Sequence, residues 1–202
     1  VVANEENPNS DAKYLFGIDK QQDGSKIRLL MNPIISIDSI ASNLDKIKVL
    51  IIGPKLEAEI LSVMSYGIPL KNITAVDLIK YSPWVDQGDM HNLPYEDNKF
   101  DLILCGWVIA YSNNKIKAAE EMTRVGKSGS IIALAATYSP LSNEEVIEKR
   151  GYLVGSEERI NNTEFLLNLF KDKVKNIYFR HDVDKEKRDS YAKILTIFSV
   201  KS

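Results

Sequence analysis

Short apolar runs alternate with helical patterns from residue 46 onward, and this alternation limits the possible folds more than any other feature of the chain. The first run, KIKVLIIG at residues 46–53, has no polar alternation, which indicates a strand buried on both faces of a sheet. Comparable runs predict further strands at residues 73–77, 84–88, 100–106 and 130–136. Strands and helices that alternate over about 150 residues predict an α/β fold with a doubly wound, mostly parallel sheet.

Helical periodicity fills the segments between the strands. Two apolar stripes predict helices that end at glycines, the first made of Leu56, Ile60, Val63 and Met64 before Gly67, the second of Ala118, Met122 and Val125 before Gly126. Ser142 and Glu145 have the spacing of a capping box, and residues 165–170 carry a third stripe. Two closing strands are predicted at residues 176–180 and 192–200, joined by a highly charged hairpin.

The chain of 202 residues has the length of one domain, and it contains no internal repeat or low-complexity tract. We divide it into an N-terminal arm at residues 1–45, which packs on the core, and a single α/β domain at residues 46–202. With 26 Lys and Arg against 28 Asp and Glu, the net charge of −2 provides no general attraction for a polyanion. Binding to nucleic acid is therefore not indicated, and the oligomeric state is not predicted.

Cysteine and histidine are too scarce for most metal or disulfide chemistry. A single cysteine, Cys105, cannot form an intramolecular disulfide or a thiolate cluster, and the two histidines, His91 and His181, are far apart in sequence. The sequence has neither a signal peptide pattern nor an apolar run of about 18 residues, the length that crosses a bilayer. We therefore expect a protein of the reducing cytoplasm without a metal or a membrane segment.

Three predicted strand ends carry residues suited to binding a nucleoside. Gly53 precedes a helix whose N-terminal N–H groups can face an anion. Asp77 ends the second strand, where a carboxylate can accept hydrogen bonds from both hydroxyls of a ribose. Asp89 follows Gly88 after the third strand, where it can accept a hydrogen bond from an exocyclic amino group. The spacing from Gly53 to Asp77 is close to the roughly 20 residues expected of a nucleoside-binding βαβ unit.

Three segments resemble the class I S-adenosylmethionine-dependent methyltransferases, particularly the small-molecule type: VLIIG, AVD ending at Asp77, and GDMHNLPYEDNKFDLILCGWVIAY at residues 88–111. The resemblance covers roughly residues 46–138. It implies a Rossmann-like sheet of seven strands with the last one antiparallel, and S-adenosylmethionine as cofactor, with S-adenosylhomocysteine as product. It also implies cofactor contacts from Asp77 with its neighbour Leu78, from Asp89 and Met90 at the adenine, and from Gly106 and Trp107 in the reaction pocket.

The first loop departs from the family pattern. The family has an acidic residue and several glycines, in the form DxGxGxG, where this chain has IIGPKLEAE, so that only Gly53 remains. We expect Gly53, Pro54 and Glu57 to contact the cofactor. In addition, Glu57 or Glu59 can meet its ammonium group and Lys55 its carboxylate, unless these are ordinary charges at a helix start.

The connection from Asp77 to Asp89 is too short for a full helix, so we expect a loop whose aromatic residues Tyr81 and Trp84 either cover the ligand or fill the place of the missing helix. Methyl transfer from a sulfonium requires mainly alignment, and a base only for weak nucleophiles. The catalytic residues therefore stay unknown, with Tyr111, Tyr138 and His91 as weak candidates. A structural role is favoured for the imidazoles of His91 and His181.

Together these features favour methyl transfer to a small-molecule or sugar-containing acceptor by in-line displacement. The N-terminal arm and residues 139–172, which lie outside the matched core, are expected to form the acceptor side. The alternative is a noncatalytic binding or scaffold protein with the same fold, because function depends on the site rather than on the fold. A dehydrogenase is disfavoured: Tyr111 and Lys115 have the YxxxK spacing, but the loop after the first strand lacks the glycines that seat a pyrophosphate.

Overall fold

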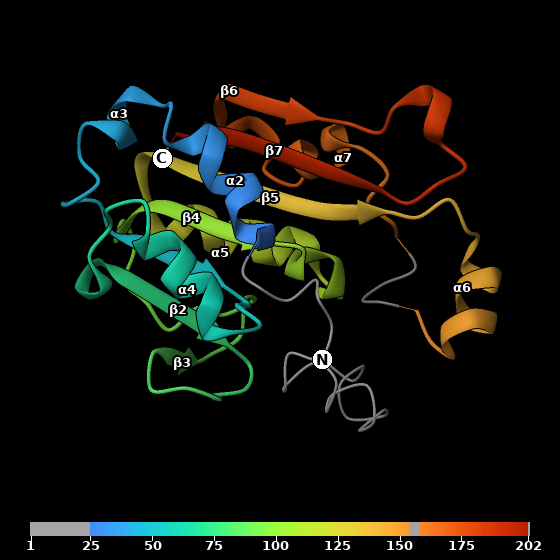
Figure 1. Cartoon of the computed structure of the whole chain (residues 1–202), viewed down its shortest axis with the longest axis horizontal. Helices are drawn as coiled ribbons and strands as arrows, with labels where there is room; N and C mark the ends of the chain where they lie inside the picture. Colours follow the sequence, from blue (N-terminus) through green and yellow to red (C-terminus); the bar gives the residue numbers. More distant parts are fainter. Residues whose placement is uncertain (1–24, 154–157, 202) are drawn as a thin grey trace.

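A seven-stranded sheet forms the centre of the molecule (Figure 1). The computed structural model describes residues 25–153 and 158–201. Within them the strand order is β3-β2-β1-β4-β5-β7-β6, and β7 runs antiparallel to both β5 and β6, while the other pairs are parallel. The predicted fold class is therefore confirmed, including the antiparallel last strand.

The strands lie close to their predicted positions. They are β1 (Val49–Ile52), β2 (Ile73–Asp77), β3 (Val85–Gln87), β4 (Phe100–Gly106), β5 (Gly126–Tyr138), β6 (Val174–His181) and β7 (Ala192–Val200). The bounds of β2, β4 and β7 equal the predicted ones. β5 begins four residues before the apolar run that predicted it, and its pairing with β4 shifts register between Phe100 and Leu102.

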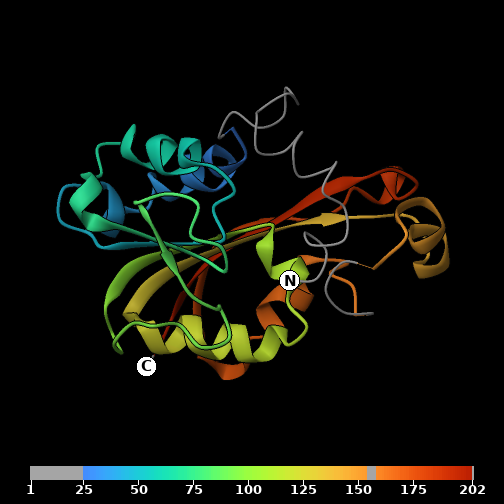
Figure 2. The same ribbon diagram turned by 90° about the horizontal axis from the view of Figure 1, so that it is seen from below.

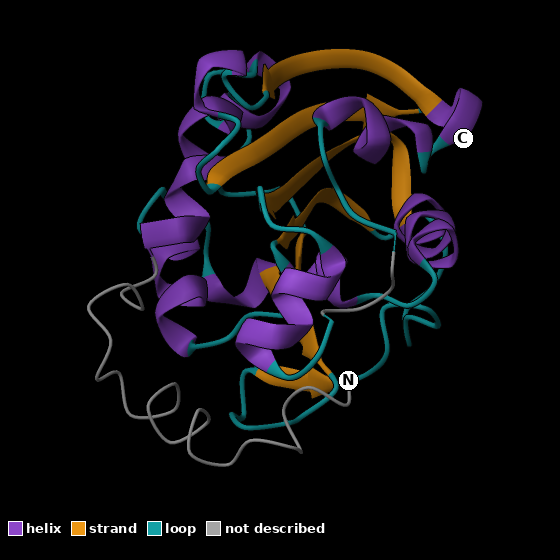
Figure 3. Cartoon of the chain, turned by 90° about the vertical axis from the view of Figure 1, so that its right-hand side faces the viewer, coloured by secondary structure: helices purple, strands orange, loops and turns teal. Residues whose placement is uncertain are grey.

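Helices cover both faces of the sheet (Figures 2 and 3). Helices α2 (Ser25–Ile34), α3 (Asp38–Ala41) and α4 (Glu57–Met64) lie on one face, and α5 (Lys115–Val125) and α7 (Thr163–Asn168) lie on the other. Helix α6 (Asn143–Arg150) lies beyond the carboxyl end of β5 (Figure 1). It begins with the predicted capping box, in which Ser142 accepts from the Glu145 N–H and the Glu145 carboxylate accepts from the Ser142 N–H.

Helix α2 supplies part of the hydrophobic core. Its apolar face consists of Ile27, Leu30, Met31 and Ile34, each at most 1% exposed. Burial of each such side chain stabilises the fold by about 2 kcal/mol. These residues belong to the predicted N-terminal arm, whose first 24 residues lie outside the described part of the chain. Residues 25–34 therefore cannot be removed without loss of core packing.

Candidate active site at the carboxyl ends of the strands

The ends of β1, β2 and β3 are held together by backbone hydrogen bonds. The Gly53 N–H donates to the Val76 carbonyl over 2.8 Å, and the Gly88 N–H donates to the Asp77 carbonyl over 2.9 Å. A Cβ on Gly88 would lie 2.8 Å from a methyl carbon of Val76, so the turn before Asp89 requires glycine. The three predicted strand ends therefore meet at one edge of the sheet, where ligands bind in folds of this kind.

The Asp77 side chain is partly buried at this edge. Its Oδ1 accepts the Ile79 N–H over 3.0 Å. Burial raises the pKa of Asp77, and the N–H groups of Ile79 and Leu78 oppose the shift. A partly buried carboxylate with few hydrogen-bond donors is stabilised by further donors, such as the two hydroxyls of a ribose.

The Asp89 carboxylate is held by His91. Its Oδ1 accepts both the backbone N–H of His91, over 2.9 Å, and the imidazole Nδ1, over 2.6 Å. The other ring nitrogen, Nε2, lies 2.7 Å from the hydroxyl of Ser112 at the end of the 3-10 turn η3 (Val108–Tyr111). Since both ring nitrogens have partners, His91 is poorly placed to take a proton from a substrate. Met90, which lies between Asp89 and His91 in the sequence, is buried in the core.

The first loop is packed tightly although it has one glycine. Gly53 has a φ of +66°, and a Cβ there would lie 2.5 Å from Cγ2 of Val108. The buried Pro54 accepts through its carbonyl from the Tyr81 hydroxyl over 2.7 Å. Tyr81 thus ties the short β2–β3 connection to the first loop, a role that the sequence did not predict for it.

The acidic side chains of this loop have partners within the protein. Glu57 is hydrogen-bonded to the Ser82 hydroxyl, which adds a second bond between the first loop and the β2–β3 connection. Glu59 accepts the Lys55 N–H over 3.1 Å. Burial raises the pKa of Glu59, whereas that N–H and the charge of Lys26 lower it. Both acids therefore serve the loop itself, and either can still meet an ammonium group.

The loop geometry predicts the effect of substituting Gly53. Gly53→Ala combines an unfavourable positive φ with a collision against Val108, and we expect it to lower the free energy of unfolding by about 2 kcal/mol. Gly67→Ala is the matched control, because Gly67 has a φ of +96° but nothing within 4 Å of the added Cβ. It is expected to cost about 1 kcal/mol in urea unfolding. Equal losses in the two variants would show that Val108 does not fill this space.

Trp107 and Lys26 border the same edge from the β4 side. Trp107, directly after Gly106, adopts a left-handed conformation with φ of 65°, which is unusual for a bulky residue, and its N–H donates to the Ala135 carbonyl. The Lys26 ammonium, from α2, lies 5.7 Å from the centre of the indole and also acts electrostatically on Glu59. Neither Lys26 nor Ser112 was predicted from the sequence, because both lie outside the nucleoside-binding pattern.

The remaining candidates are placed differently. Tyr111 is 45% exposed at the end of η3, close in sequence to Trp107. The Tyr138 hydroxyl donates to the Arg188 carbonyl over 3.1 Å, so it is engaged with the β6–β7 hairpin. His181 is exposed at the end of the edge strand β6, with β7, β5 and β4 between it and β1. Tyr111 therefore lies near the candidate site at the carboxyl edge of the sheet, whereas His181 does not.

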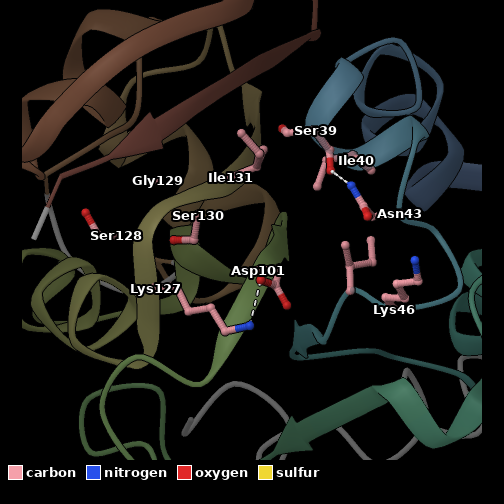
Figure 4. A pocket seen from close by; sticks show the side chains of 11 residues that line it. Ser39, Ile40, Asn43, Lys46, Asp101, Lys127, Ser128, Gly129, Ser130 and Ile131 are labelled. Carbon is pink, nitrogen blue, oxygen red and sulfur yellow. Dashed lines mark hydrogen bonds and ion pairs between the residues drawn. The ribbon is translucent and has the colours of Figure 1, made fainter.

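The described residues contain no group of three or more side chains able to hold a metal ion. A shallow pocket of about 330 Å³ lies at the opposite, amino-terminal ends of β4 and β5 (Figure 4). There Lys127 is paired with Asp101 at 2.7 Å. This pocket is separated from the carboxyl edge by the length of the strands, so it takes no part in the candidate site. In the part of the chain that the structure covers, none of the helices is long and apolar enough to span a membrane.

The residues at the carboxyl edge fit the nucleoside half of the expected cofactor. Asp77 has a carboxylate oxygen, Oδ2, with no hydrogen bond from the described side chains, and the same holds for Oδ2 of Asp89. For the amino-acid half, Lys26 and Glu59 bring opposite charges to the edge where the glycines are missing. The Lys26 ammonium can donate to a carboxylate, as backbone N–H groups do in glycine-rich loops, and the Glu59 carboxylate can accept from an ammonium group.

Comparison with known proteins gives a family match for the central part of the chain. Residues 56–134 match the sequence model of the family described as "Methyltransferase domain", and the match begins after Gly53, within the glycine-poor stretch at residues 51–59. No curated protein sequence gives a significant match.

Many solved structures have a similar fold. One is from the complex between the Haloferax volcanii Trm112 methyltransferase activator and the putative methyltransferase, with 15% identity, 96% of this chain and 98% of that chain covered, and a TM-score of 0.67. A putative sarcosine dimethylglycine methyltransferase from Galdieria sulphuraria has 13% identity, coverage of 86% and 85%, and a TM-score of 0.60.

A third structure, the N-methyltransferase NodS from Bradyrhizobium japonicum WM9 in complex with S-adenosyl-L-homocysteine, has 14% identity, coverage of 88% and 87%, and a TM-score of 0.57. At these identities the structural likeness establishes the fold alone.

Proposed function

We propose that the chain is a class I S-adenosylmethionine-dependent methyltransferase, which methylates a small-molecule or sugar-containing acceptor at the carboxyl edge of its sheet. The observation that carries this proposal is the position of Asp77 and Asp89 on neighbouring strand ends, joined by the bond from the Gly88 N–H to the Asp77 carbonyl. Two carboxylates so placed can bind the ribose and the adenine of one nucleoside.

The bound cofactor would supply a methyl group on a sulfonium, which is activated for in-line displacement. The chain's own residues would hold the nucleoside through Asp77 and Asp89, and Lys26 and Glu59 would face the charged groups of the methionine part. Trp107 and the half-exposed Tyr111 would then border the place of the acceptor. Such a site acts mainly by aligning the two reactants, which needs no dedicated base when the acceptor is a good nucleophile.

A small acceptor is supported by charge and by the relatives. The chain is nearly neutral, so it has no general attraction for RNA or DNA. The putative sarcosine dimethylglycine methyltransferase, one of the proteins with the same fold, is named for small amines. Residues 139–153 and 158–172, which include α6, would form part of the acceptor side, because α6 lies beyond the carboxyl end of β5 (Figure 1).

Binding and product formation test the proposal separately. Titration with S-adenosylmethionine and S-adenosylhomocysteine, followed by calorimetry, is expected to give saturable binding, with NAD as a nonbinding control. Methyl-labelled cofactor with a cell extract should then give, only when the protein is added, a labelled dialysable product that separates from the cofactor in chromatography. Label confined to RNA or protein would refute the acceptor class. Absence of binding at millimolar cofactor would refute the proposed site and favour the noncatalytic scaffold.

A further inference from the structure

Asp89, His91 and Ser112 form a chain of hydrogen bonds beside the proposed adenine position. An ionised carboxylate only accepts hydrogen bonds, so Nδ1 of His91 carries the proton that is donated to Asp89 over 2.6 Å. In the neutral imidazole, Nε2 is then an acceptor for the hydroxyl of Ser112 at 2.7 Å. The Ser112 oxygen in turn accepts the Asn114 N–H over 3.1 Å. Every donor in this chain has an acceptor.

The order of groups is that of a Ser-His-Asp triad, but its exposure argues against nucleophilic catalysis. Ser112 is 1% exposed, so a substrate cannot reach its hydroxyl. The accessible member is Asp89, whose side chain is 48% exposed, whereas that of His91 is 20% exposed. The chain therefore leads from a buried anchor to an exposed carboxylate, which is the geometry for holding that carboxylate in place.

We infer that His91 is a positioning residue, which fixes Asp89 so that its second carboxylate oxygen accepts the 6-amino group of adenine and rejects bases without an amino group there. This inference rests on the proposed function. Oδ1 takes both donors of His91, so rotation of the carboxylate would break two hydrogen bonds. Oδ2, which has no hydrogen bond from the described residues, is the oxygen left for the ligand.

The charges around the chain keep this arrangement stable. Partial burial raises the pKa of Asp89, but the hydrogen bonds from the N–H and the imidazole of His91 lower it by more. The net pKa is below the usual value, so the carboxylate stays ionised. The Lys115 ammonium donates to the Ser112 carbonyl over 3.0 Å and fixes the backbone of the anchor. The buried Glu121 of α5 accepts the Leu93 N–H over 2.8 Å and so holds the polypeptide segment that follows His91.

Base preference is the property that a merely structural role of His91 would not change. The measurement compares, by calorimetry, the affinity for S-adenosylhomocysteine with that for S-inosylhomocysteine, in which an oxygen replaces the 6-amino group and faces the carboxylate. We expect the wild-type protein to prefer the adenine form about a hundredfold, because a site built to accept a hydrogen bond leaves a group unpaired with the wrong base. His91→Ala is expected to weaken adenine binding about tenfold and to lower the preference to about tenfold.

Three further variants sharpen the test. His91→Asn keeps a donor near the position of Nδ1 and is expected to restore most of the preference, although it cannot reach Ser112. Ser112→Ala removes the anchor and is expected to cost about twofold in affinity, since Asp89 still holds the ring. His181→Ala replaces the other histidine, which is exposed on β6, and should change neither affinity nor preference.

The outcomes separate this inference from the proposed function. A wild-type protein that does not bind S-adenosylhomocysteine would refute the proposed function. Normal binding with an unchanged base preference in folded His91→Ala would refute the positioning role alone. If His91→Ala does not fold, the proton resonance of Nδ1 in the wild-type protein decides: it should shift on addition of the adenine form and less so with the inosine form, and equal responses would overturn the inference.

Discussion

Asp77→Ala is expected to weaken the binding of S-adenosylhomocysteine about a hundredfold, the loss of two hydrogen bonds to a charged acceptor. The Asp77 carboxylate lies at the end of β2 next to the Gly88 turn, where its Oδ1 accepts the Ile79 N–H. Alanine has no side-chain acceptor, so the variant would offer the ribose hydroxyls no carboxylate at this position. Isothermal titration of the variant and the wild-type protein measures the effect directly.

Asp86→Ala is the matched control for this variant. Asp86 lies on the neighbouring strand β3, it is exposed, and its carboxylate accepts the Tyr95 hydroxyl over 3.0 Å. We expect cofactor affinity to change less than twofold there, since a surface contact of this kind contributes little. Similar affinities for Asp77→Ala and the wild-type protein would place the ribose elsewhere and would remove the main support of the proposed site.

The raised pKa of Asp77 adds a prediction about pH within the same experiment. Burial stabilises the protonated form, so the carboxylate is lost at a higher pH than the value near 3.9 of an ordinary aspartate. Protonation removes the charge that attracts the ribose hydroxyls. Cofactor affinity of the wild-type protein should therefore decline as pH falls toward this raised pKa, whereas the weak binding of Asp77→Asn should not follow that decline.

The sequence predicted the sheet well because its signals are local. Each central strand is an apolar run with polar ends, and the glycines at 53 and 88 mark turns that a Cβ would obstruct. The short connection after β2 was also predicted to lack a helix, since too few residues separate Asp77 from Asp89. The hydrophobic period of a segment, the residues of its turns and the length of a connection all depend on residues that are neighbours in sequence. A single sequence is therefore enough to predict them.

The contacts that shape the site were not predicted because they join distant segments. His91 and Ser112 are 21 residues apart and meet only when the β3–β4 loop folds over η3. Tyr81 and Pro54 are 27 residues apart, and their hydrogen bond joins two loops that the sequence pattern treats separately. Lys26 reaches the site from α2, outside the recognisable motifs. No periodicity encodes such contacts, since they depend on the geometry of the finished sheet.

Arg124→Ala is expected to lower the free energy of unfolding by about 4 kcal/mol, because it leaves the buried Glu121 carboxylate without the cation that is hydrogen-bonded to it. The Arg124 guanidinium donates to both carboxylate oxygens of Glu121, over 2.9 and 2.7 Å, and to the carbonyls of Leu93 and Tyr95. The Glu121 side chain is only 8% exposed. One side chain thus fastens α5 to the loop that follows His91, and urea unfolding measures its loss.

Lys117→Ala is the control, because its ammonium lies 4.0 Å from the same carboxylate but is 47% exposed, and a change below about 0.5 kcal/mol is expected. Arg124 also lowers the pKa of Glu121 by hydrogen bonding, so the stabilisation is complete above the unfolded pKa of about 4.3 and is lost as pH falls from there through the lowered pKa of the folded state. The difference in the free energy of unfolding between the wild-type protein and Arg124→Ala should therefore become smaller at acidic pH. A difference independent of pH would mean that Arg124 stabilises the loop through the carbonyls of Leu93 and Tyr95 rather than through Glu121.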